Sequence, residues 1–131
     1  MASYGAKSMS RLMTCHPDIQ MVMVEVVKEF DNAILEGERG EERQNFLFDS
    51  GQSEVQFPNG KHNTSPSRAV DAAPWPLDWE NKERFILFGG YVLGVAARMG
   101  VNLVWGGDWN KDWNTKDHKF FDGPHFQLAD E

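Results

Sequence analysis

The sequence contains only one cysteine, Cys15, and so cannot form an internal disulfide. A chain without disulfides is typical of proteins that are made and kept in a reducing compartment. One thiol is also too few for a cysteine-rich zinc cluster. The fold must therefore depend on burial of apolar surface, and 131 residues are enough for one domain spanning residues 1–131 to bury most of its apolar surface.

Basic residues are also fewer than acidic residues. The chain has 13 Lys and Arg against 20 Asp and Glu, which gives a formal net charge of −7. Nucleic acids and anionic membrane surfaces both attract positively charged proteins. We therefore expect no nucleic-acid partner and no stable membrane association, and we expect a monomer.

Long apolar runs are missing as well. The first residues, MASYGAKSMSRLMTCHPD, contain no apolar stretch long enough for a signal peptide, and no other stretch approaches the length of a membrane-spanning helix. We expect a protein that stays in the cytoplasm after synthesis, so any work outside it would require another agent to release the protein.

Two long segments have the apolar spacing of amphipathic helices. The first is expected from Pro17 to about Asp31, because Pro17 suits a first helical turn and Asp18 favours a helix start. The other is expected to be capped by Asp78 and ended by Gly100. Its predicted core stripe consists of Phe85, Phe88, Tyr91, Val92, Val95, Ala96 and Met99.

A shorter helix is predicted within GEERQNFLFDSG, with Phe46 and Leu47 pointing inward and Gly51 ending it. A polar loop, residues 52–67, follows this helix and contains His62. Loops of this length in a compact domain are usually functional or disordered.

Four short segments are expected to be strands: residues 33–36, RAVDAAP up to Pro74, VNLVW at 101–105, and HFQL at 125–128. The strands are few and alternate with helices and loops. This pattern predicts an α+β domain in which helices pack against a small, mainly antiparallel sheet.

Two histidines and two aspartates are candidates for chemistry. His62 precedes Asp71, a charge on an otherwise apolar strand, and burying a carboxylate is costly unless it is paired or binds a metal. His125 begins the last strand, and the DGPH turn holds Asp122 close to it. His62, Asp71 and His125 could hold zinc and leave one position for water, and Asp122 could take a proton from that water.

Simpler interpretations of these residues are also open. Asp71 could pair with Arg68 or Arg84, and Asp122 with Gly123 could form only a turn. Widely separated His, Asp and His residues are a loose pattern. Spacing alone therefore does not decide between a metal site and an acidic globular domain without metal.

Four segments carry a more specific pattern. GERGEERQ, KHNTSPSRAVDAAPWPLDW, WGGDW and DGPHFQL occur in this order between Glu36 and Leu128. They resemble the zinc peptidases that include phage L-alanyl-D-glutamate endopeptidases and D-alanyl-D-alanine carboxypeptidases. That family shares its fold with the hedgehog signalling domain, so the resemblance implies the same α+β architecture and a peptidase activity.

The resemblance also implies a role for each candidate. The histidine and aspartate of the family's first motif and the histidine of its last motif bind Zn²⁺, and here these are His62, Asp71 and His125. The acidic residue three positions before the last histidine is the general base, here Asp122. The resemblance thus divides the four residues into three metal ligands and one proton carrier.

An arginine of the family's G-x-R segment contacts the substrate carbonyl or its developing oxyanion. Arg39 matches that position, and Arg43 is the alternative if the register differs. The chain departs from many members at two places, with Gly60 two residues before the first histidine and Gln127 after PHF. Neither position is a ligand, so these departures concern substrate contacts.

The remaining candidates have weaker signals. His118 is expected to be a loop residue that could contact substrate, and His16, before Pro17, is expected to be structural. Most of the five tryptophans should lie in the core or in a cleft wall, and Trp109 is the best cleft candidate. Asp108 could orient a ligand histidine or form a turn.

The first functional hypothesis is a phage endolysin that cuts the peptide stems of peptidoglycan at the L-Ala-D-Glu bond. Its expected path is the host cytoplasm until lysis and then the periplasm and cell wall. One alternative is a D-Ala-D-Ala carboxypeptidase, against which the absent signal peptide counts. Another is a non-catalytic zinc-containing binding module, which is less expected because Asp122 is present.

Overall fold

A four-stranded antiparallel sheet forms the centre of the computed structural model, which describes residues 2–116 and 121–130. The strand order is β1-β2-β4-β3, and every neighbouring pair is antiparallel. The predicted α+β fold with a small antiparallel sheet is confirmed. The strand bounds are Asn32–Glu36 (β1), Ala69–Pro74 (β2), Leu103–Trp105 (β3) and His125–Leu128 (β4).

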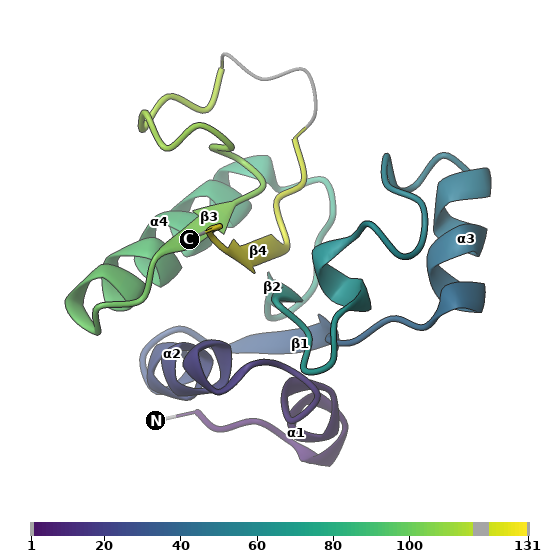
Figure 1. Ribbon diagram of the computed structural model, residues 1–131. Coiled ribbons are helices and arrows are strands. Elements are labelled where there is room, and N and C mark those ends of the chain that lie inside the picture. The colour runs from purple at the N-terminus through teal and green to yellow at the C-terminus, as the bar shows by residue number, and fades with distance from the viewer. Residues whose placement is uncertain (1, 117–120, 131) are drawn as a thin grey trace.

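Two helices, α2 (Pro17–Val27) and α4 (Lys82–Arg98), pack against each other, and α4 also contacts β2 and β3 (Figure 1). Their apolar stripes meet because residues three and four apart lie on one helix face. The core that results includes Ile19, Val22, Met23, Val26, Phe88, Val92, Ala96 and Phe126, all of them fully or almost fully buried.

The helix starts differ in one detail from expectation. His16 caps α2 by accepting a hydrogen bond at Nδ1 from the N–H of Asp18, 3.0 Å away, which gives this histidine its structural role. The cap of α4 is Asn81, whose Oδ1 accepts from the N–H of Arg84, and not Asp78 as predicted. Asp78 instead accepts from the N–H of Glu80 in the turn before the helix.

Two shorter helices complete the fold. Helix α1 (Ala6–Leu12) was not predicted, because it packs on β1 and fully buries only Leu12, and so has no repeated apolar spacing. Helix α3 (Glu41–Asp49) lies where it was predicted. Its Leu47 is buried, but Phe46 is 58% exposed, so the inward orientation predicted for Phe46 was wrong.

The register of the sheet positions the residues of interest. Asp71 in β2 lies directly opposite His125 in β4. An irregularity between Ile34 and Glu36 in β1 places Glu36 opposite Asp71 on its other side. A short 3₁₀ helix, η1 (Lys61–Asn63), lies between α3 and the sheet and carries His62 (Figure 1).

Candidate metal and catalytic site

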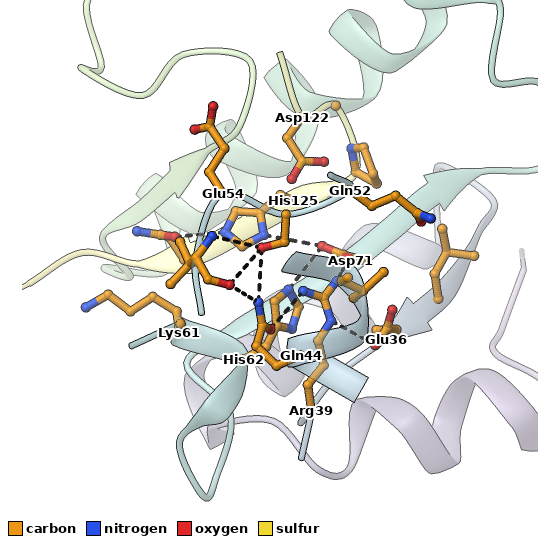
Figure 2. Close-up of a pocket in the computed structure, with 18 of the residues that line it drawn as sticks. Glu36, Arg39, Gln44, Gln52, Glu54, Lys61, His62, Asp71, Asp122 and His125 are labelled. Atoms are coloured by element: carbon orange, nitrogen blue, oxygen red, sulfur yellow. Dashed lines mark hydrogen bonds and ion pairs between the residues drawn. The ribbon is translucent and has the colours of Figure 1, made fainter. Parts of the chain in front are cut away.

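Three side chains converge where η1, β2 and β4 meet. Nε2 of His62 lies 3.2 Å from Oδ1 of Asp71, and Nδ1 of His125 lies 3.3 Å from the same oxygen (Figure 2). One potential ligand atom from each residue lies within 4.8 Å of the others, and all three residues are buried. The structure therefore brings together His62, Asp71 and His125, which the sequence analysis had selected.

The protons of both rings can be assigned from their other partners. Nδ1 of His62 lies 2.7 Å from the carbonyl oxygen of Gly37, and Nε2 of His125 lies 2.8 Å from Oε1 of Gln127. Carbonyl and amide oxygens only accept hydrogen bonds, so in each neutral ring the proton is on these nitrogens. The two remaining ring nitrogens then direct their lone pairs toward Asp71.

Three acceptor atoms that face one another repel unless a cation lies between them. This donor set of two imidazole nitrogens and one carboxylate oxygen is the set that zinc prefers in hydrolytic sites. The second hydrogen bond of each histidine is the arrangement that orients metal-binding rings. The residues present thus fit a metal ion of this class.

The pKa shifts of Asp71 and His125 also fit a cation at this position. Burial would raise the pKa of Asp71, but the two neighbouring histidines outweigh burial and hold that pKa well below its usual range. Burial would lower the pKa of His125, but its hydrogen bond to Asp71 and the charge of Asp71 raise it instead. The cluster therefore stabilises a positive charge beside Asp71, as a proton or as a metal ion.

Arg39 occupies the other side of Asp71. One terminal nitrogen of its guanidinium donates to Oδ2 of Asp71 at 2.7 Å, the other faces Oε1 of Gln44 at 3.3 Å, and Nε donates to Glu36 at 2.8 Å. Arg43 also pairs with Glu36, at 2.9 Å. Asp71 is thus held by Arg39, and not by either arginine that the sequence analysis had offered as a partner.

Gln44 joins the segments around the site. It is buried on α3, and its amide nitrogen donates to Oγ of Ser53 and to the carbonyl oxygen of Val55. Its amide oxygen accepts from Arg39 and from Asn63 in η1. The helix, the polar loop and the 3₁₀ turn that carries His62 are therefore tied together through one side chain.

Asp122 lies on the side of the cluster away from Arg39, and Figure 2 shows its carboxylate directed toward His125 and Asp71. The backbone of the DGPH segment forms the expected turn, because the N–H of His125 donates to the carbonyl oxygen of Asp122 at 3.1 Å. Burial, reinforced by the negative charge of Asp71, raises the pKa of Asp122. A raised carboxyl pKa suits a group that takes and returns a proton.

The cluster lies at the base of a cleft of about 970 Å³. His62, Asp71, His125, Asp122, Arg39 and Arg43 all line it, together with apolar side chains on its walls. Trp109 lies against His125 with 5.4 Å between ring centroids, as predicted for a cleft wall. The other apolar wall residues include Leu47, Val55, Trp79, Phe85 and Phe121.

The chain matches one known protein family along nearly its whole length. The family model described as "Phage L-alanyl-D-glutamate peptidase" matches residues 1–129. The chain belongs to this family.

Two relatives place the chain within the family. It is 27% identical to the L-alanyl-D-glutamate peptidase of Escherichia phage T5, over 96% of this chain and 97% of that protein. It also resembles the crystal structure of the L-Ala D-Glu endopeptidase ChiX of Serratia marcescens, with a TM-score of 0.76 and 26% identity over 97% of this chain and 90% of that one. Both alignments extend over nearly the whole chain.

Asp108 and several tryptophans, which the sequence also marked as candidates, lie outside the cluster. Asp108 accepts hydrogen bonds from the N–H groups of Asp112 and Trp113, which supports its turn role. Trp105 is buried, whereas Trp75 and Trp113 are largely exposed. His118 lies outside the described residues.

Three residues that support the cluster, one directly and two through Arg39, were not recognised as such from the sequence. Gln127 had been noted only as a departure from the family pattern, although its position two residues after His125 puts both on one face of β4. Glu36 and Gln44 carried no signal, because their contacts with Arg39 arise only when β1 and α3 fold around it.

Proposed function

We propose that this protein is a zinc-dependent endopeptidase that hydrolyses the bond between L-alanine and D-glutamate in the peptide stems of peptidoglycan. The observation that carries the proposal is the set of three lone pairs on His62, Asp71 and His125, which converge at the base of a cleft beside Asp122. The relatives that match over nearly the full chain bear the names of such peptidases.

Nε2 of His62, Oδ1 of Asp71 and Nδ1 of His125 would hold the zinc ion. When bound, zinc supplies Lewis-acid chemistry, which lowers the pKa of water toward roughly 7 and polarises a carbonyl group. Gly37 and Gln127 keep the two rings in the required tautomers. Arg39 holds the second oxygen of Asp71, which leaves Oδ1 directed toward the histidines.

Asp122 acts as general base and then as general acid. Its carboxylate takes a proton from the attacking water and returns it to the nitrogen of the leaving D-glutamate. This transfer needs a carboxyl group close to the metal ligands, and the position of Asp122 beside His125 in Figure 2 supports this role.

Arg39 was expected to contact the substrate carbonyl or the developing oxyanion, and this stays a prediction. Its guanidinium lines the cleft, but its nitrogens already face Glu36, Gln44 and Asp71. A substrate oxygen would therefore have to share one of these donors. Arg43, the alternative, is half exposed and pairs with Glu36.

Mass analysis of the fragments released from purified peptidoglycan tests the proposal directly. Cleavage of the L-Ala-D-Glu bond leaves L-alanine on the sugar strand and releases peptides that begin with D-glutamate. Release of terminal D-alanine alone would instead identify a D-Ala-D-Ala carboxypeptidase. Metal analysis of protein purified without added zinc, together with loss of activity on chelation, tests the metal and separates this proposal from an inert binding module.

The route to the substrate belongs to the same proposal. Within the described ranges, no helix is long and apolar enough to cross a membrane. We infer that the protein acts as an endolysin, which waits in the host cytoplasm until lysis and then reaches the wall as a monomeric domain of residues 1–131. Fractionation of infected cells before and after lysis would follow the protein along this path.

A further inference from the structure

Lys82 is a positive charge on the wall of the cleft, in the first turn of α4. Its ammonium group lies 4.5 Å from the centroid of the Phe121 ring. Phe121 in turn packs edge-on against Trp105, with 5.9 Å between centroids, and the indole N–H of Trp105 donates to the carbonyl oxygen of Gly123. The ammonium group of Lys82 therefore lies against an aromatic ring. The residues before and after Asp122, Phe121 and Gly123, are both held by contacts with the buried Trp105.

The other cations of the cleft wall are already paired with acids. Arg39 binds Asp71 and Glu36, Arg43 binds Glu36, and Lys61 binds Asp130. Among the cleft-lining residues that the structure describes, Lys82 is the cation with no carboxylate within ion-pair distance. An aromatic face stabilises an ammonium group but leaves its N–H donors directed toward solvent and ligand.

The position of Lys82 relative to the reaction follows from Asp122. The residue after Phe121 is Asp122, which under the proposed function returns a proton to the leaving nitrogen. The leaving-group side of the cleft is therefore the side where Phe121 and Lys82 lie. A leaving glutamate has two carboxyl groups, and a linear stem uses only one of them for its next peptide bond. The other remains a free carboxylate on the leaving residue.

We propose that Lys82 binds this free carboxylate of the leaving glutamate and so selects an acidic residue on that side of the scissile bond. The inference rests on the proposed function and adds a determinant of specificity to it. A charge-assisted hydrogen bond in a partly enclosed cleft is stronger than the same contact on an open surface. Lys82 is the cleft-wall cation whose N–H donors no described carboxylate occupies, so it is the one best placed to bind an incoming carboxylate.

The test compares two synthetic stem peptides that differ only at this group, one with the free carboxylate and one with a carboxamide in its place. The zinc-loaded wild type should cleave the carboxylate peptide with a kcat/KM about three- to tenfold higher than the amide peptide. Lys82→Gln should lose that preference by a lower rate on the carboxylate peptide alone, and Lys82→Arg should restore most of it.

Lys61→Gln is the matched control, because it removes the same charge from the same cleft but from a lysine that is already paired with Asp130. It should keep the preference. Equal cleavage of both peptides by the wild type, or an equal loss on both in Lys82→Gln, would overturn the role of Lys82 while leaving the peptidase proposal intact. Cleavage of neither peptide by the zinc-loaded wild type would overturn the proposed function itself.

Discussion

Gln127 accepts a hydrogen bond from Nε2 of His125 at 2.8 Å, and both side chains project from the same face of β4. Because the amide oxygen can only accept, this contact keeps the proton on Nε2 and leaves Nδ1 free to face Asp71. The position had been noted as a departure from the family's glutamate. In the structure, the amide oxygen of Gln127 accepts the hydrogen bond that a carboxylate at this position would accept from His125, without adding a negative charge.

Removing the hydrogen-bond acceptor at position 127 should weaken metal binding without unfolding the protein. We expect Gln127→Ala to lower zinc affinity by about tenfold, because the ring of His125 loses the partner that fixes its tautomer and orientation. Gln127→Glu should retain or increase the affinity. Competition titration with a chromogenic chelator measures both values.

Gln52→Ala is the control, since Gln52 also lines the cleft and its backbone N–H bonds to Leu47. Its zinc affinity should match that of the wild type. An unchanged affinity in Gln127→Ala would show that the hydrogen bond to His125 does not tune the metal site.

Asp122 should be separable from the metal ligands. We expect Asp122→Ala to bind one zinc ion with an affinity close to that of the wild type and to lose hydrolysis by at least a hundredfold, as for removal of a general base. Asp71→Asn should lose both metal and activity. Zinc content by atomic emission and cleavage of purified peptidoglycan give the two readouts, and retained full activity in Asp122→Ala would sink its assignment.

Glu36 should stabilise the fold in a pH-dependent manner. Burial opposes its ionisation, but hydrogen bonds from Arg43 and Arg39 outweigh burial and lower its pKa. A carboxyl group with a lowered folded-state pKa stabilises the protein fully above its unfolded pKa of about 4.3, and this stabilisation disappears as the pH falls through the folded value. The free energy of unfolding of Glu36→Gln should therefore be lower than that of the wild type by about 1–2 kcal/mol at pH 7, and this difference should shrink on acidification.

Urea unfolding in the presence of a chelator, repeated between pH 7 and pH 3, measures that difference without a metal contribution. Glu29→Gln, at an exposed position in the turn after α2, should show little difference at any pH. A gap for Glu36→Gln that stays constant down to pH 3 would argue against the ion pairs as its cause.

Two glycines of α4 should respond in opposite directions to the same substitution. A Cβ added to Gly89 would lie 2.4 Å from the buried ring of Trp105, whereas one added to Gly94 would meet nothing within 4 Å. Gly89→Ala should destabilise the protein by about 1–3 kcal/mol through overpacking. Gly94→Ala should stabilise it by about 0.5–1 kcal/mol because alanine favours a helix interior. Thermal unfolding of both variants measures the two changes in stability.

The elements with strong local signals were predictable. HFQL became β4, and the apolar stripe that includes Phe88 and Val92 became the buried face of α4. Local patterns failed where several residues compete for one role. Asn81 rather than Asp78 caps α4, and Phe46 is exposed because a helix as short as α3 buries Leu47 and Gln44 instead.

In the candidate site, too, some residues were predictable from the sequence and others were not. His62, Asp71 and His125 could be selected because the segments that carry them resemble a known family, and η1, β2 and β4 bring the three side chains together. The network behind them could not be predicted. The contact of Glu36 with Arg39 depends on the irregular pairing of β1 with β2, and the contacts of Gln44 depend on how the polar loop closes over α3. Such contacts are set by tertiary folding and leave no periodic trace in the chain.

The strand order has a consequence for how the protein acquires activity. β4 follows the other strands in the chain but lies between β2 and β3, so its insertion pairs Asp71 with a histidine 54 residues away. Contacts of such long range form slowly and late. Until β4 inserts, the three ligands are not assembled, β2 lacks its second neighbour and β3 has no strand to pair with. A copy in which β4 has not paired with β2 therefore lacks a complete set of ligands, so capture of zinc during refolding should follow that pairing.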